Sequence, residues 1–286
     1  MGVGKEFCCM ILPPEDLRKA QLLMLKILKE VHRVCEENGI RYFLSDGTLI
    51  GAVRHNGFIP WDDDSDIGML REDYEKFIDI APEKLGKEFC LQIYKTDCGY
   101  GQQFGKVLLS GTKWIERGEF CTSRLFSGIF IDIFPYDKIP TGRLKQKFLH
   151  FSYHFWSAQV LIKQKYIIYP YVHGFLHKVN FIIKKAIGLL FSLDYSVRKR
   201  DSICMRYKDR NKNFCITKYG GNFWKNQNCY ESFKTFVLHT FEDSKFYIPS
   251  DYDSILTNLY GDYMTLPPPE KRKNHGVVEY DFGDYL

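Results

Sequence analysis

The sequence predicts an α+β fold in which helices flank a mixed β-sheet. Three patterns predict it: a long amphipathic helix near the N-terminus, a short helix between two strand-like segments, and a series of strand-like segments from residue 89 to residue 134. The chain has 286 residues, of which 45% are hydrophobic and 26% are charged. It is therefore long enough to form one large domain with its own core.

The N-terminal elements are bounded by clear helix signals. Pro13 and Pro14 precede two acids at the start of the first helix, and Asn38-Gly39 is typical of its end. Residues 55–57, His-Asn-Gly, predict a turn after the short helix. The expected elements are helices at 17–37, 47–53 and 73–81 and strands at 41–44 and 64–70.

The following region predicts strands, and the C-terminal part predicts one further helix. We expect Pro135 to end the last strand of the series and the tail from Pro267 to be loop-like, because it opens with consecutive prolines. The expected elements are strands at 91–94, 104–109, 113–116 and 128–134 and a helix at 251–260.

Residues 142–196 form a basic, aromatic segment in which acids are nearly absent. The pattern predicts one or two helices. It is compatible with a helical subdomain that packs into the core, and with a basic amphipathic surface that lies on anionic lipid.

The composition limits the partners, the metal sites and the location that this protein can be expected to have. The net charge of +5 suits an anionic substrate or a membrane surface, and the absence of a Lys/Arg-rich arm argues against a nucleic-acid partner. The sequence has nine cysteines, an odd number, and contains no C-x-x-C motif. We therefore expect reduced thiols rather than a zinc site or disulfides. Without a secretory signal or a run of about 18 apolar residues, a cytoplasmic protein is expected.

Four of the five residues from Asp62 to Asp66 are aspartates, and an apolar strand follows them. Side chains alternate along a strand, so Asp64 and Asp66 are expected to point the same way. Two such carboxylates can hold Mg²⁺, or Mn²⁺, through oxygen. A solvated acidic loop is the alternative; a calcium EF-hand is disfavoured because Ile67 stands where that motif needs glycine.

Asp132 lies in the apolar segment 128–134. A carboxylate in such a strand is rarely without a partner or a function. It either forms a structural salt bridge or joins Asp64 and Asp66, as a metal ligand or as the base that accepts a proton from an attacking hydroxyl.

Residues suited to phosphate binding flank the acids. Gly47 lets backbone approach a phosphate, and N–H groups at a helix start attract anions, to which Thr48 adds a hydroxyl. Arg54 could bind phosphate bidentately or pair with an acid of the cluster. The tail residues that could contact a substrate, or simply form an exposed basic tail, are Lys271, Arg272 and His275.

These motifs resemble the LicD family, whose eukaryotic relatives include fukutin and fukutin-related protein. The matching segments are 46–54, 57–67, 131–135 and 260–264, with Pro267, Pro268 and His275. The resemblance implies a nucleotidyltransferase-like fold with a Gly47-Thr48 phosphate loop, a metal-binding pair at Asp64 and Asp66, and a third acid at Asp132. The expected organisation is a catalytic core at 1–140, a basic helical insertion at 141–200, and a part completing the catalytic domain at 201–286.

The resemblance also implies a reaction. Family members transfer phosphocholine from CDP-choline to cell-surface glycans such as lipopolysaccharide or teichoic acid precursors, and eukaryotic relatives transfer ribitol phosphate from CDP-ribitol. We therefore expect Mg²⁺-dependent transfer of a phospho-alcohol to a sugar hydroxyl with release of CMP. The partners would be a CDP-linked alcohol and a glycan or lipid-linked glycan, in the cytoplasm or at the inner face of the cytoplasmic membrane.

Two other hypotheses remain open at this point. The same metal pair could serve nucleotidyl transfer from a nucleoside triphosphate, which releases pyrophosphate. A protein of another class, a non-catalytic binding protein at the membrane, would use the basic aromatic segment and would not need the aspartates.

Overall fold

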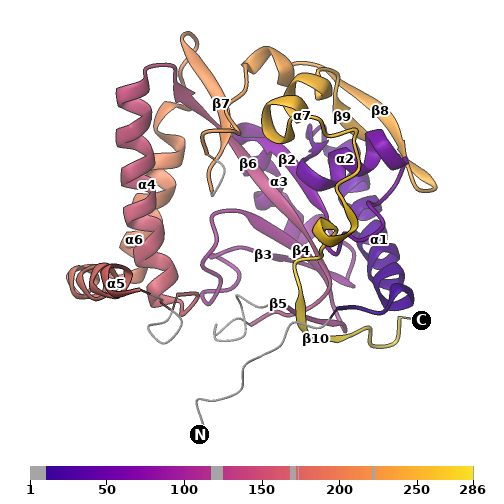
Figure 1. Ribbon diagram of the computed structural model, residues 1–286, viewed down its shortest axis with the longest axis horizontal. Coiled ribbons are helices and arrows are strands. Elements are labelled where there is room, and N and C mark those ends of the chain that lie inside the picture. The colour runs from indigo at the N-terminus through magenta and orange to yellow at the C-terminus, as the bar shows by residue number, and fades with distance from the viewer. Residues whose placement is uncertain (1–10, 117–124, 168–171, 173, 221–222, 286) are drawn as a thin grey trace, which may run out of the picture.

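The computed structural model describes residues 11–116, 125–167, 172, 174–220 and 223–285, and its centre is a six-stranded mixed sheet (Figure 1). The strand order is β1-β2-β6-β4-β3, and β7 also pairs with β6. This arrangement confirms the predicted α+β fold. The strands are β1 (Phe43–Leu44), β2 (Asp66–Leu70), β3 (Phe89–Gln92), β4 (Gly105–Leu109), β6 (Phe130–Pro140) and β7 (Phe214–Lys218).

The long strand β6 organises the sheet. It runs parallel to β2 and antiparallel to β4 and β7, so the sheet is mixed. The prediction that Pro135 ends this strand was wrong. On one edge, β6 pairs with β4 up to Ile133 and with β7 from Tyr136 onwards. Pro135 falls between those two ladders, where its missing N–H costs no ladder bond on that edge.

Three helices precede or follow the first two strands, as the sequence predicts. They are α1 (Pro14–Asn38), α2 (Asp46–His55) and α3 (Arg71–Lys84). Helix α1 buries an apolar face and ends at Gly39, whose φ of 61° is the left-handed conformation that glycine adopts at little cost. Helices α1 and α3 contact each other and pack on the sheet, and α2 packs against β2.

Where the structure describes the basic aromatic segment, it shows three helices rather than one or two. They are α4 (Arg143–Lys163), α5 (Phe175–Gly188) and α6 (Leu193–Cys204). Gly174 opens α5 with a φ of 85°, and the Ser192 side chain caps α6 by accepting from the backbone N–H of Tyr195. Helices α4 and α6 stand side by side at one edge of the sheet, and α5 contacts α4 (Figure 1). The division into three domains stays a prediction.

The C-terminal part adds more strands than the sequence predicts. A hairpin of β8 (Phe236–Phe241) and β9 (Ser244–Pro249) precedes α7 (Tyr252–Tyr260), which agrees with the expected helix. The tail is not all loop, because β10 (Val277–Asp281) pairs antiparallel with β5 (Lys113–Glu116). Among the described helices, none combines the length and apolar character needed to cross a bilayer.

Candidate active site

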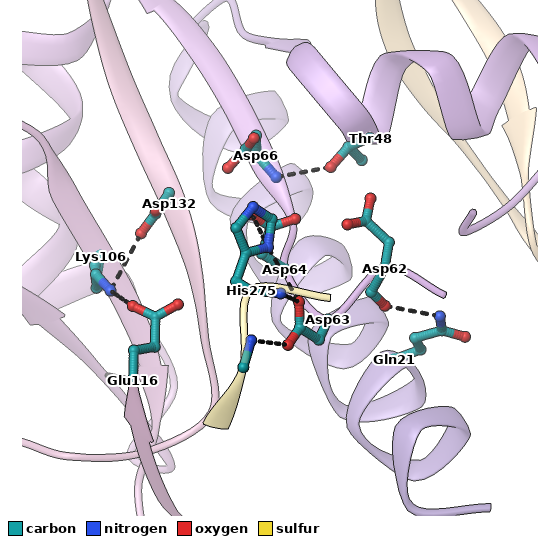
Figure 2. Close-up of polar contacts among 11 residues, drawn as sticks. Gln21, Thr48, Asp62, Asp63, Asp64, Asp66, Lys106, Glu116, Asp132 and His275 are labelled. Carbon is teal, nitrogen blue, oxygen red and sulfur yellow. Dashed lines mark hydrogen bonds and ion pairs between the residues drawn. The ribbon is translucent and has the colours of Figure 1, made fainter. Parts of the chain in front are cut away.

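The three predicted catalytic acids come together where β2 and β6 lie side by side (Figure 2). Asp66 is the first residue of β2 and is in register with Asp132 on the parallel strand β6, so both side chains lie on one face of the sheet. Asp64 precedes β2 rather than belonging to it, yet its charge acts on both of the other acids. Because Asp64 lies outside β2, strand alternation does not apply to it, and the shared direction of Asp64 and Asp66 stays a prediction.

The acids repel one another. Burial, followed by the charge of Asp62, raises the pKa of Asp64 well above its usual range. Burial, followed by the charge of Asp64, does the same to the pKa of Asp66. Carboxylates in this situation are stabilised by a cation that they share. The donor set of Asp64, Asp66 and Asp132 thus fits the predicted divalent metal, which stays a prediction.

A second acidic group, formed by Asp62, Asp63 and His275, has ligand atoms within 4.8 Å of one another. Asp63 is buried and accepts from the backbone N–H of His275 at 2.8 Å and of Gly276 at 3.3 Å, while Nδ1 of His275 lies 3.1 Å from the same carboxylate. Both oxygens of Asp63 are therefore engaged by the tail. We interpret this group as the contact that fixes the tail against the acids.

His275 adds positive charge to the site. Its Nδ1 also lies 3.3 Å from Oδ2 of Asp64. The hydrogen bond with Asp63, together with the charges of Asp64 and Asp62, raises the pKa of His275 to about 10. The side chain predicted to contact substrate therefore lies directly on the acidic cluster.

The start of α2 is fixed against the acids. The Thr48 hydroxyl accepts a hydrogen bond from the backbone N–H of Asp66 at 2.7 Å. A Cβ at Gly47 would lie 2.9 Å from Oδ2 of Asp62, so glycine permits the close approach. The predicted phosphate loop thus begins beside Asp66, and the first-turn N–H groups of α2 start there.

Two lysines at the site, of which Lys106 is buried and Lys218 is largely enclosed, were missed by the sequence analysis. Lys218 on β7 lies 2.5 Å from Oδ2 of Asp46 and 3.8 Å above the ring of Phe134. Burial would lower the pKa of Lys218, but the charges of Asp46 and Asp66 raise it. The signal was absent because β7 itself was not predicted.

Lys106 on β4 is the second missed cation. Its Nζ lies 3.7 Å from Oδ1 of Asp132 and 3.4 Å from Oε2 of Glu116, and the residue is 2% exposed. A lysine inside the apolar strand pattern at 104–109 was the signal that could have identified it.

The remaining predicted binding residues lie on the tail side of the cluster. Arg54 donates to the carbonyl oxygen of Tyr263 at 2.6 Å rather than to an acid. Arg272 lies 5.2 Å above the ring of Trp61. The pKa of Arg54 is lowered, mainly by burial and in addition by the charge of Arg272. Among the described residues, neither arginine forms an ion pair. Lys271 is exposed nearby on the tail.

Two pockets reach residues that contact the cluster. The first, of about 390 Å³, is lined by Lys218 together with Phe134 and Tyr153. The second, of about 820 Å³, is lined by His275 together with Trp61 and Arg272. These pockets give room for substrate groups beside Lys218 and beside His275.

Comparison with known proteins places the chain in a family. Residues 39–167, which hold Gly47, Thr48, Asp64, Asp66 and Asp132, match the family described as LicD/FKTN/FKRP, nucleotidyltransferase domain. The lipopolysaccharide cholinephosphotransferase LicD of Haemophilus influenzae is 31% identical over 277 residues, 92% of this chain and 97% of that protein. The ribitol 5-phosphate transferases FKRP of mouse and human are 47% identical over 53 residues, 17% of this chain and 11% of theirs. With its nucleotidyltransferase-like α+β fold and a relative that matches nearly from end to end, the chain belongs to the LicD family.

Proposed function

We propose that this protein transfers phosphocholine from CDP-choline to a sugar hydroxyl of a cell-surface glycan and releases CMP. The observation that carries the proposal is that Asp66, which is bonded to Thr48 at the start of α2, lies in register with Asp132 and within reach of the charge of Asp64. Support for the donor and the acceptor class comes from the similarity to the Haemophilus influenzae cholinephosphotransferase over nearly the whole chain.

In the proposed reaction, the oxygen of the acceptor hydroxyl forms a bond to the phosphorus that bears choline. The bond between that phosphorus and the oxygen bridging to CMP breaks, and CMP leaves with this oxygen. The hydroxyl proton passes to Asp132, whose charge Lys106 balances from the other side. Mg²⁺ held by Asp64, Asp66 and Asp132 would neutralise charge on the phosphate oxygens.

The other groups position the donor. The first-turn N–H groups of α2 and the ammonium of Lys218 suit the oxygens of the diphosphate, because all are donors fixed beside Asp66. Arg54 and Arg272 offer two guanidinium groups without acidic partners among the described residues, as an anionic substrate would require. Catalysis would thus consist mainly of positioning and charge neutralisation.

The test is a transfer assay with CDP-choline, an acceptor glycan and Mg²⁺, in which release of CMP is measured. Asp64→Asn and Asp132→Asn are each expected to lower the rate at least about 100-fold while the circular dichroism spectrum stays unchanged. Asp79→Asn, a change on the outer part of α3, is the control and should leave the rate as it is. Full activity in Asp132→Asn would remove this residue from the mechanism.

A second candidate is transfer of ribitol phosphate or another polyol phosphate from a CDP-polyol, which the local similarity to FKRP favours. Calorimetric titration with CDP-choline, CDP-ribitol, CTP and ATP, each with and without Mg²⁺ or Mn²⁺, separates the hypotheses. Binding of one CDP-alcohol names the donor. A preference for a triphosphate points to nucleotidyl transfer, and no nucleotide binding points to a binding protein.

We propose a cytoplasmic location, where the enzyme would meet a lipid-linked acceptor at the membrane.

A further inference from the structure

Helix α5 lies on the outside of the molecule with little protein around it (Figure 1). Of its 14 residues, Phe181 and Gly188 are buried. Gly188 marks the contact with α4: Nζ of Lys163 donates to its carbonyl oxygen at 2.8 Å, and a Cβ on Gly188 would collide with the side chain of Gln159. Most of the other side chains of α5 are exposed, so packing within the described part of the chain does not explain their composition.

The outward surface of α5 is strongly apolar. Phe175 and Leu176 are 80% and 78% exposed, and Ile182 and Ile183 are 53% and 51% exposed. At about 100° per residue, these positions fall on one stripe of the helix. The stripe is completed by Val179, Ala186, Leu189 and Leu190. A contiguous apolar surface of this kind usually marks an interaction site.

The charges next to this stripe have one sign. Helix α5 carries Lys178, Lys184 and Lys185, and no Asp or Glu occurs from residue 138 to residue 193. The partner of this surface should therefore be apolar at its centre and negatively charged around it. A bilayer containing anionic lipid has this combination, with acyl chains below a layer of negative headgroups.

The length of α5 determines how it would meet the bilayer. Its 14 residues extend about 21 Å, which is shorter than the roughly 30 Å hydrocarbon core. A helix of this length, with lysines beside an apolar stripe, lies in the plane of the interface.

We propose that α5 docks on the surface of a bilayer that contains anionic lipid, with the stripe from Phe175 to Leu190 inserted and its lysines at the headgroups. Helix α4 connects this face to the reaction centre, because α4 also supplies Tyr153 and Ser157 to the pocket beside Lys218. Docking would hold that pocket close to a lipid-linked substrate. The docking itself does not depend on the identity of the reaction.

The experiment is sedimentation of the full chain with vesicles of phosphatidylcholine alone and with equal parts of phosphatidylcholine and phosphatidylglycerol. The wild type should bind the second kind and be released by salt. The double variant Ile182→Gln/Ile183→Gln should bind about tenfold more weakly. Its matched control is Leu238→Gln/Met264→Gln, at positions 52% and 53% exposed elsewhere on the surface, which should bind as the wild type does.

A second pair of variants tests the charge without touching the apolar stripe. Lys184→Gln/Lys185→Gln should weaken binding to the anionic vesicles, and Lys87→Gln/Lys245→Gln, at exposed lysines outside the helical segment, should not. Equal binding to both vesicle types, no binding at all, or unchanged binding by the α5 variants would overturn the proposal. A wild-type dimer that Ile182→Gln/Ile183→Gln dissociates, without vesicle binding, would instead assign this face to a second copy of the chain. CDP-choline binding measured on the same variants separates this outcome from a failure of the proposed reaction.

Discussion

Thr48 shows how one side chain can serve both the fold and the site. Its buried hydroxyl accepts from the backbone N–H of Asp66 and so joins the start of α2 to the start of β2. Thr48→Val keeps the shape but leaves that N–H without its partner, so we expect a loss of about 1–3 kcal/mol in the free energy of unfolding and slower transfer. Urea denaturation and the transfer assay measure the two effects.

Thr48→Ser is the control, since it restores the hydroxyl and should recover most of both losses. If Thr48→Val were as stable and as active as the wild type, the hydroxyl would not be what positions Asp66.

At this scale the sequence identified the acids better than the cations. Asp64, Asp66 and Asp132 could be predicted because acids in apolar strand patterns are rare and costly. Lys218 could not, because its role depends on β7 pairing with β6 far away in the sequence. The role of Arg54 in substrate binding stays a prediction, and its bond to the Tyr263 carbonyl depends on where the tail lies, which local patterns do not encode.

At the scale of elements, the β8–β9 hairpin is attached to α1 by an ion pair. Arg18 on α1 donates to both oxygens of Glu242 at 3.0 and 2.6 Å, and Glu242 also accepts from the backbone N–H of Phe58. The hydrogen bond with Arg18 lowers the pKa of Glu242 below its ordinary value of 4.5. A carboxyl group with a lowered pKa stabilises the fold above its unfolded-state pKa, and this contribution is lost as the pH falls through the folded-state value.

We therefore predict that Glu242→Gln lowers stability at pH 7 by about 0.5–1 kcal/mol, a small value because Arg18 is half exposed. The difference from the wild type should shrink as the pH falls below about 4.5, where the wild type also loses its charge. Urea denaturation at several pH values measures it. The neighbouring Asp243→Asn, which removes a more exposed pair with Lys29, is the control and should change less. A difference that grew in acid would contradict the sign of this argument.

The predicted elements succeeded where periodicity was local and failed where pairing was distant. Helices α1 and α7 and strand β5 lie where the sequence placed them, because each has its own pattern and end signals. Strand β10 was missed because five residues in a proline-bounded tail become a strand through pairing with β5, more than 150 residues away along the chain. The same reason applies to β7, which exists through its pairing with β6.

At the scale of the whole molecule, the helices after β6 are fixed to the loop that connects β3 with β4. Arg200 on α6 is 1% exposed and donates to the carbonyl oxygens of Gly101 at 2.6 Å and Gln102 at 3.1 Å. Arg200→Ala would leave both carbonyls without this donor and should cost about 2–3 kcal/mol. Because the helices share such contacts with the rest of the fold, a single unfolding transition is expected in both the wild type and the variant.

Arg198→Ala is the matched control on the same helix, because its pair with Asp194 is exposed and should be worth less than about 0.5 kcal/mol. Calorimetry measures both the number of transitions and the midpoint. Two separate transitions in the wild type would show that the helical segment is an independent domain, as the division at residues 141–200 supposes.

Without a bound cation, repulsion within the acidic cluster lowers the free energy of unfolding of the whole molecule. Burial and the charge of Asp64 make an ionised Asp66 costly, and the charge of Lys218 compensates part of that cost. Asp66→Asn keeps the shape of the side chain and removes one of the repelling charges. We expect the variant to lose transfer activity and yet to unfold, without metal, at a free energy higher by about 0.5–2 kcal/mol than the wild type.

Addition of Mg²⁺ should reverse that order. A cation that binds the folded wild type raises its stability by mass action, and Asp66→Asn, with a weakened ligand set, should gain much less. Thermal unfolding of both proteins in chelator and in rising Mg²⁺ measures the difference without any activity assay. If the wild type showed no response to Mg²⁺ or Mn²⁺ while remaining folded, the carboxylates would have to be balanced by the protein's own cations, and the proposed metal site would be wrong. If the response appears in the wild type and is lost in Asp66→Asn, the repulsion among the buried acids is the cost that the metal removes.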